Sequence, residues 1–125
     1  MERSTQHDIP IVTCSRIQQV LMYIHQNLNL PLMLEDIAEQ SCWSRWQLQR
    51  VFQKETGYSV ANYVRELKLN EAANQLLTTS DRVIDIAIAL GFSSEISFSR
   101  AFKQAHNLSP SAFRKQRKAA VQLPI

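Results

Sequence analysis

The residues best suited to binding chemistry lie close together, between Arg45 and Gln53. If this segment is a helix, positions i, i+1, i+4, i+5 and i+8 share one face. These positions hold Arg45, Trp46, Gln49, Arg50 and Gln53. Arg can hold guanine and Gln can hold adenine through paired hydrogen bonds, and each good pair gives about 1–3 kcal/mol of base discrimination. The spacing therefore predicts a helix that reads DNA bases.

The neighbouring residues support such a helix. Ser44 and Gln47 have the spacing of a capping box, which predicts a helix that begins after Ser44 and runs to about Thr56. Three of the four residues on its other side are apolar, so that side should face a core. The four are Leu48, Val51, Phe52 and Glu55.

Two of the exposed-face residues also have simpler interpretations. A single Trp is more often a core residue than a ligand contact, although flanking arginines favour an exposed Trp46. Arg50 taken alone suits phosphate as well as a base, since roughly half to two-thirds of protein–DNA hydrogen bonds go to the backbone.

The chain contains an internal repeat. A shift of 49 residues aligns Asp36-Ile37-Ala38 with Asp85-Ile86-Ala87, and a shift of 50 then aligns Arg50 with Arg100 and Phe52 with Phe102. Each copy reads as a short helix, a turn and a longer helix, which is the helix-turn-helix unit. The first unit is predicted at about 34–56 and the second at about 83–106.

The shift transfers the exposed face to the second copy. There it comprises Glu95, Ile96, Ser99, Arg100 and Lys103, while Phe98, Ala101, Phe102 and Ala105 are predicted to pack inward. Ile96 suits a thymine methyl and Arg100 a guanine or phosphate, whereas Glu95 repels phosphates unless it accepts from cytosine. We expect the second copy to discriminate bases less sharply than the first.

The remaining elements complete an all-α fold. A helix is predicted from Ser15 to near Asn27, a long linking helix at about 59–78 and a last helix at about 109–118. Residues 1–14 read as a loose leader and 119–125 as a tail, so the domain spans about 15–118. The expectation is seven helices, with two helix-turn-helix units joined by the linking helix.

Several polar residues beside these faces are candidates for phosphate contact, with simple capping or solvation as the alternative for each. They are Ser44, Gln53, Arg65, Lys68, Ser93, Ser94, Lys103, Arg114 and Lys115.

Composition excludes several other classes. The net charge of +3 is local, because without Arg114, Lys115, Arg117 and Lys118 the rest sums to −1. Cys14 and Cys42 lack metal-ligand spacing, the histidines are scattered and no Gly-rich phosphate loop occurs, so no metal, cofactor or catalytic site is expected. No apolar stretch reaches 18 residues, which predicts a soluble intracellular protein without a membrane span.

Several strings are also familiar. The segment 44–52, the later Gly91-Phe92-Ser93, the segment 98–103 and the segment 109–114 resemble the AraC/XylS family of bacterial transcription activators. The resemblance spans about Ile17 to Lys118 and is greatest to the small stand-alone, MarA/SoxS-like members, because no ligand-binding domain is evident.

This resemblance implies a monomer that places its two helix-turn-helix units in adjacent major-groove segments of a bipartite site on bent double-stranded DNA. It implies base reading by the positions that match Trp46, Gln49 and Arg50, and by Glu95, Ile96, Ser99 and Arg100. It also implies contact with RNA polymerase, no small-molecule effector, and a place in the bacterial cytoplasm at the nucleoid. The alternative is a helical protein-interaction module, or an antagonist of another regulator.

Three features depart from the family pattern, and one length suggests a DNA bend. Cys42 stands where the first turn usually has glycine, and Met33 stands where a helix-capping residue is usual. Glu95 and Ile96 replace a polar pair of the similar stand-alone members, so the second half-site should differ from theirs. A linking helix of about 18 to 20 residues spans roughly 27–30 Å, whereas successive major-groove segments are about 34 Å apart. The shortfall predicts a bent site.

Overall fold

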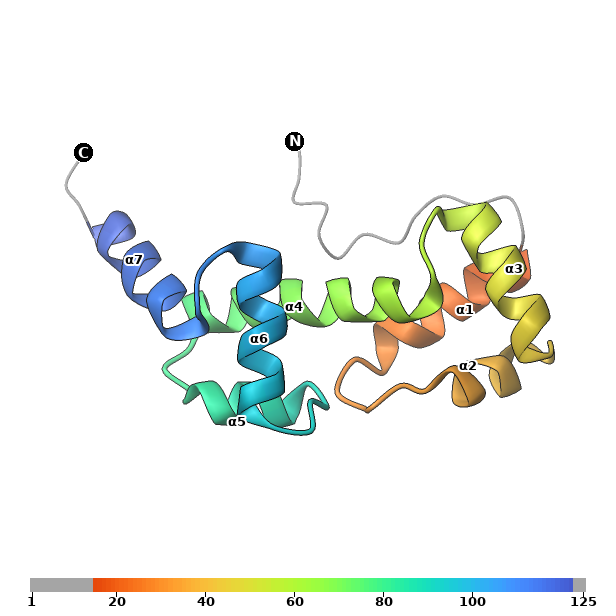
Figure 1. The fold of residues 1–125 in the computed structure, drawn as a ribbon, viewed down its shortest axis with the longest axis horizontal. Coiled ribbons are helices and arrows are strands. Elements are labelled where there is room, and N and C mark those ends of the chain that lie inside the picture. The colour runs from red at the N-terminus through yellow and green to blue at the C-terminus, as the bar shows by residue number, and fades with distance from the viewer. Residues whose placement is uncertain (1–14, 123–125) are drawn as a thin grey trace. The chain divides into compact units, whose positions relative to one another are not determined.

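The computed structural model describes residues 15–122, with side chains to residue 116, and this part of the chain forms seven α-helices and no strand. The helices are α1 (Ser15–Gln26), α2 (Leu34–Ser41), α3 (Arg45–Thr56), α4 (Val60–Thr78), α5 (Val83–Ala89), α6 (Glu95–His106) and α7 (Pro110–Gln122) (Figure 1). The predicted all-α fold is confirmed. The leader predicted at 1–14 lies outside the described residues.

Serine side chains cap the N-termini of four helices, including the one predicted at Ser44. Ser44, Ser59, Ser94 and Ser109 each accept a hydrogen bond from the backbone N–H three residues later, at 3.0–3.2 Å. The serines come in two pairs separated by 50 residues, so the internal repeat extends to the helix starts. Of the two candidate caps for α6, Ser94 rather than Ser93 caps the helix.

The start of α2 lacks a side-chain cap, as Met33 leads one to expect, whereas the end of α7 differs from the prediction. Met33 makes no side-chain cap for α2, although the Asp36 carboxylate accepts from the Met33 N–H at 3.4 Å. The last helix continues to Gln122 instead of ending near residue 118. The reason is in the sequence, since Ala119 and Ala120 favour helix and the next proline is Pro124.

Two compact units divide the chain inside α4, between Leu67 and Lys68. Unit 1 contains α1, α2, α3 and the first part of α4, and unit 2 contains the rest of α4 with α5, α6 and α7 (Figure 1). Each unit therefore holds one helix-turn-helix pair together with a helix before it and a helix after it.

The core of unit 1 is built from the apolar stripe of α1 and the inner faces of α3 and α4. Leu48 and Phe52 are fully buried, as predicted. The Phe52 and Tyr63 rings meet edge to face with centroids 5.5 Å apart, and the Tyr63 hydroxyl forms a 2.7 Å hydrogen bond with His25 Nε2. This bond joins α1 to α4 within the unit.

The core of unit 2 is rich in aromatic rings. Phe98 and Phe102 are fully buried, and the Phe102 ring lies against Phe113 with centroids 5.2 Å apart. The prediction that Ala105 packs inward is wrong, because Ala105 is exposed and His106 lies 4.4 Å from the Phe102 ring instead. Steps of four residues from Phe98 follow the buried side, and this spacing reaches His106 rather than Ala105.

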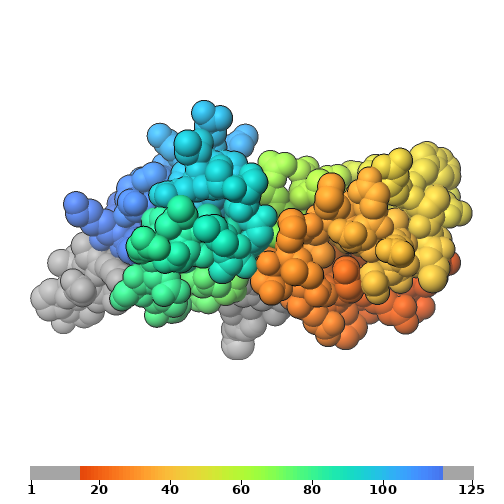
Figure 2. Space-filling model, turned by 90° about the horizontal axis from the view of Figure 1, so that it is seen from below, coloured from red at the N-terminus to blue at the C-terminus, as the bar shows by residue number. Residues whose placement is uncertain are grey.

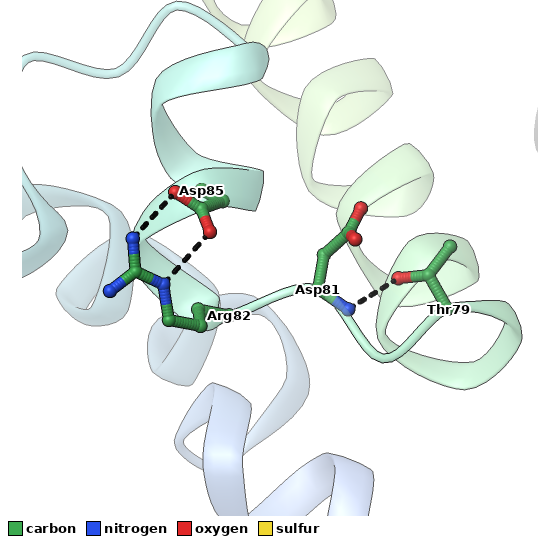
Figure 3. A network of polar contacts seen from close by, with 4 residues as sticks. All are labelled: Thr79, Asp81, Arg82 and Asp85. Carbon is green, nitrogen blue, oxygen red and sulfur yellow. Dashed lines mark hydrogen bonds and ion pairs between the residues drawn. The ribbon is translucent and has the colours of Figure 1, made fainter.

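Side chains also fix the turn between α4 and α5 in unit 2. The Thr79 hydroxyl accepts from the Asp81 N–H at 3.2 Å, and the Arg82 guanidinium donates to both carboxylate oxygens of Asp85 at 2.9 and 3.3 Å (Figure 3). Both members of the ion pair are largely exposed, so it orders the start of α5 more than it stabilises the fold.

Candidate nucleic-acid interface

We call α3 and α6, the longer helices of the two helix-turn-helix units, the first and second recognition helices. The first recognition helix begins directly after Ser44, as the capping box predicts. The Gln47 N–H donates to Ser44 Oγ at 3.1 Å, and the Ser44 N–H donates to Gln47 Oε1 at 3.2 Å. Both bonds of the predicted box are present. They place Arg45 and Trp46 in the first turn of α3.

The turn before this helix has an unusual backbone. Cys42 adopts the left-handed conformation, with φ of 61° and ψ of 25°, and ends α2 with a 3.4 Å bond from its N–H to the Glu39 carbonyl. A residue with a Cβ is strained there by about 1–2 kcal/mol. The position where the family pattern has glycine therefore adopts a positive φ in this chain too, although it is occupied by cysteine.

The outer face of α3 is exposed as predicted. Arg45, Trp46, Gln49, Arg50 and Gln53 are all exposed. Trp46 has 68% of its surface accessible, which excludes the alternative of a core tryptophan. The Arg50 guanidinium lies 4.9 Å from the centroid of the Trp46 ring, so an aromatic plane and a charged donor form one surface.

An acidic residue of α2 holds one of these donors. Arg45 Nη1 lies 2.9 Å from Glu35 Oε2, and both side chains are more than half exposed. Figure 2 shows the surface of α2, in orange, beside that of α3, in yellow. Arg45 is thus paired within the protein, whereas a DNA contact would replace this weak surface pair.

The second recognition helix presents an equivalent face of different chemistry. Glu95, Ile96, Arg100 and Lys103 are exposed, and Ser99 is half-buried. Ile96 is 67% accessible and occupies the position of Trp46 under the 50-residue shift. An aliphatic side chain so exposed at the start of a recognition helix suits contact with a thymine methyl.

Most of the predicted phosphate contacts lie at the surface. Ser44, Gln53, Arg65, Ser93, Ser94, Lys103 and Lys115 are exposed. The two serines at the start of α6 are 3.5 Å or less from Ser97 through their side-chain oxygens. Of these, Ser44, Ser93 and Ser94 lie at the N-termini of α3 and α6, where anions are favoured.

Two residues predicted to contact phosphate have partners within the protein. Lys68 is only 6% accessible and donates from Nζ to the Leu90 carbonyl, and burial lowers the pKa of its ammonium group. Arg114 is half-buried and donates to the carbonyls of Leu76 and Thr79 at 3.0 and 3.1 Å. Both side chains donate to backbone carbonyls at or directly after helix ends within unit 2.

One residue beside the first turn was not singled out from the sequence. Arg16 Nη2 of α1 donates to the Ser41 carbonyl at 2.6 Å, and its guanidinium lies 4.1 Å from the centroid of the Trp43 ring. The isolated position of Arg16 in the first turn of α1 gives no signal of either contact. Only the packing of α1 against α2 brings them together.

The described part of the chain holds neither a metal-binding cluster nor a membrane-spanning helix. Among residues 15–122, no group of three or more His, Cys, Asp or Glu side chains is arranged to hold a metal ion. Within the same range, no helix has the length and apolar character needed to cross a membrane.

Comparison with known proteins identifies the family of the chain. A family model described as a helix-turn-helix domain matches residues 37–116. The transcriptional activator AarP of Providencia stuartii is 43% identical over 100 residues, which cover 80% of this chain and 74% of that protein. The multiple antibiotic resistance protein MarA of Escherichia coli is 38% identical over 98 residues, covering 78% of this chain and 77% of that protein.

A solved structure agrees as well. An AraC-type transcriptional regulator from Chromobacterium violaceum has a TM-score of 0.75 and 34% identity, covering 82% of this chain and 92% of that chain. The duplicated helix-turn-helix, the exposed basic and aromatic faces and these relatives agree with one another. The chain therefore belongs to the AraC/XylS family of helix-turn-helix transcription regulators and is related to its MarA-like activators, and it is not an enzyme.

Proposed function

We propose that the chain activates transcription by binding a bipartite DNA site as a monomer and by contacting RNA polymerase. One observation carries this proposal. Trp46 and Ile96 are large, apolar and about two-thirds exposed at equivalent positions, and each is followed four residues later by an exposed arginine, Arg50 or Arg100. A protein that presents this pair of side chains twice has two surfaces suited to a major groove.

The first surface is the more selective reader in this proposal. Arg50 and Gln49 offer the donors that pair with guanine and adenine, and the Trp46 ring, with its centroid 4.9 Å from the Arg50 guanidinium, supports Arg50. Arg45 joins them when DNA displaces Glu35. The second surface depends on the methyl groups of Ile96 and on Arg100, with Glu95 and Ser99 restricting the neighbouring bases.

Contacts to the backbone then fix the register on the duplex. The exposed residues proposed for this role are Ser44, Gln53, Arg65, Ser93, Ser94, Lys103 and Lys115. We propose a bent duplex, because a helix of 19 residues such as α4 is about 28 Å long and two groove segments on one DNA face are about 34 Å apart.

The test begins with selection of bound fragments from bacterial genomic DNA by the purified full chain. Footprinting of the selected fragments is expected to reveal two protected segments about one helical turn apart, and sedimentation of the complex one protein per duplex. Affinity is expected to fall by orders of magnitude between low and moderate salt. Affinity that barely changes with salt, or a single protected segment, would contradict the proposal.

Contact with polymerase needs its own measurement. In transcription with purified bacterial RNA polymerase, adding the protein to a template that carries the selected site is expected to raise transcript yield. A template with the site scrambled is the control. Binding to DNA without any effect on yield would retain the DNA-reading part of the proposal and remove activation.

A further inference from the structure

The two helix-turn-helix turns share a contact with a cationic side chain. In unit 1, Arg16 of α1 donates to the Ser41 carbonyl at the end of α2. In unit 2, Lys68 of α4 donates to the Leu90 carbonyl directly after α5. Ser41 and Leu90 are the same position under the 49-residue shift that aligns the two copies. A cation therefore reaches the same carbonyl in both turns.

The two cations are also equivalent to each other. A shift of 52 residues aligns α1 with the second part of α4 and pairs buried residues throughout: Ile17 with Leu69, Val20 with Ala72, Leu21 with Ala73 and Ile24 with Leu76. The same shift pairs Arg16 with Lys68. The unit boundary between Leu67 and Lys68 falls where this alignment begins, so the repeat includes the helix that precedes each helix-turn-helix.

Electrostatics explains a cation at this place. The last carbonyls of a helix have no partner within the helix and carry partial negative charge. Directly after the bonded carbonyl the backbone turns into the left-handed region, at Cys42 in one unit and Gly91 in the other. The recognition helices begin three and four residues later, at Arg45 and Glu95. The cation thus fixes the backbone of the turn that precedes each recognition helix.

The two equivalent hydrogen bonds, from Arg16 to the Ser41 carbonyl and from Lys68 to the Leu90 carbonyl, have different surroundings. Arg16 is exposed and also lies over the Trp43 ring in the same turn. Lys68 is buried within unit 2. Because only 6% of Lys68 is accessible and one of its N–H groups donates to the Leu90 carbonyl, Lys68 is poorly placed to contact phosphate, whereas Lys103 of α6 is exposed.

We propose that Arg16 and Lys68 are positioning residues for DNA recognition, each holding one turn and thereby the recognition helix of one half-site, and that neither acts by binding phosphate. The proposal rests on the proposed function, because it assigns one half-site to each unit. It predicts that each residue affects its own half-site alone, which neither a phosphate contact nor a general loss of stability would do.

The DNA experiment uses four variants on three duplexes. The variants are Arg16→Met, Arg16→Lys, Lys68→Met and Lys68→Arg, and the duplexes are the footprinted site and two versions with one half-site scrambled. Lys68→Met is expected to lose about tenfold in affinity for the intact site, as expected for one charge-assisted hydrogen bond, and nothing where the second half-site is scrambled. Arg16→Met is also expected to lose affinity for the intact site, but to lose nothing where the first half-site is scrambled. Lys68→Arg, which keeps the cation, is expected to bind with the affinity of the wild-type chain.

Salt dependence separates positioning from phosphate contact. Lys68→Met is expected to leave the slope of log affinity against log salt unchanged, whereas Lys103→Met is expected to reduce it by about one. A reduced slope for Lys68→Met, or an equal loss on all three duplexes, would overturn the proposal.

Hydrogen exchange of the free protein gives a readout that needs no DNA. Lys68→Met is expected to speed exchange of the Gly91 and Phe92 amides about tenfold and to leave the Cys42 and Trp43 amides unchanged. Arg16→Met is expected to do the reverse, and because Arg16 is exposed this variant retains its fold if the Lys68 variant does not. Unchanged exchange in both variants would refute the proposal even if the wild-type chain binds DNA. A wild-type chain that binds no duplex would refute the proposed function and with it the role in DNA recognition, whereas the exchange result would still show whether each cation holds its turn.

Discussion

Cys42 and Gly91 hold the same position in the two helix-turn-helix turns, and both adopt a left-handed backbone, with φ of 61° and 83°. The second pair of left-handed residues, Gly57 and Asn107, lies at the ends of the two recognition helices and is separated by 50 residues. The repeat is therefore a repeat of backbone conformation. The fold requires this conformation at position 42 even though the side chain there disfavours it.

Replacing Cys42 with Gly is expected to raise the free energy of unfolding by about 0.5–1 kcal/mol. The reason is that removing Cβ relieves about 1–2 kcal/mol of left-handed strain, while the more flexible unfolded chain offsets about 0.4–1 kcal/mol. Chemical denaturation measures this change. The matched control is Gly57→Ala, where φ is 82° and an added Cβ meets no atom within 4 Å, so conformational strain alone should lower stability by about 1 kcal/mol. A destabilised Cys42→Gly variant would contradict the prediction.

Replacing Arg50 with Ala is expected to relax specificity at one base position in the first half-site, with a loss of about 1–3 kcal/mol for the preferred base. Trp46→Ala is expected to weaken the whole first half-site, because Arg50 also loses the ring beneath it. Competition with duplexes substituted one base at a time measures both effects. Lys115→Ala is the control and should weaken binding to every sequence alike. Equal loss on all sequences for Arg50→Ala would assign Arg50 to phosphate.

Replacing Glu35 with Gln is expected to strengthen DNA binding several-fold at low salt. The change removes a negative charge beside the interface and frees Arg45 from its 2.9 Å ion pair. Stability should change by less than about 0.5 kcal/mol because the pair is exposed. Affinity and denaturation measured on the same variant separate the two effects. Glu39→Gln, on the same helix, is the control, and weaker binding by Glu35→Gln would show that the ion pair prepares Arg45 for DNA.

The last helix offers a comparison between two adjacent basic residues. Arg114→Met is expected to lower the free energy of unfolding by about 1–3 kcal/mol, because the guanidinium holds the Leu76 and Thr79 carbonyls at the end of α4. Lys115→Met should change stability by less than about 0.5 kcal/mol. Denaturation and the salt slope of DNA binding measure both roles. A stable Arg114→Met variant with a reduced salt slope would restore Arg114 to the phosphate contacts.

The sequence predicted the helices, the caps and the exposed faces because these depend on local spacing. Ser44 and Gln47 specify a helix start by themselves, and the repeat transferred that information to Ser93 or Ser94, of which Ser94 is the cap. The partners of Lys68 and Arg114 were not predictable in this way. Both are basic residues of helices, and only the packing of one helix against another turns a side chain of this length toward a carbonyl rather than toward solvent.

Two further differences have similar physical origins. The equivalence of α1 with the second part of α4 preserves apolar character but few residue identities, so a search for identical residues does not detect it. Ala105 and His106 are neighbours in sequence, and hydropathy favours Ala105 for the core. The ring of His106 instead fills space between Phe102 and Phe113, with centroids 4.4 and 5.6 Å away.

The Tyr63 hydroxyl makes the stability of unit 1 depend on pH in the alkaline range. Burial, with a smaller contribution from Tyr58, raises the pKa of Tyr63 from 10.0 to about 12. The neutral phenol is thus favoured in the folded state. Its contribution to stability is complete below pH 10 and is lost as the pH rises from 10 to 12.

Tyr63→Phe is therefore expected to flatten the decline in the free energy of unfolding between pH 10 and 12. At neutral pH the same variant should be less stable by about 1 kcal/mol, because the 2.7 Å hydrogen bond to His25 is lost. Denaturation at a series of pH values measures both effects. Tyr58→Phe is the control and should retain most of the decline, since burial is the larger cause of the raised pKa. An equally steep decline in Tyr63→Phe would assign the alkaline sensitivity to other groups, such as the lysines.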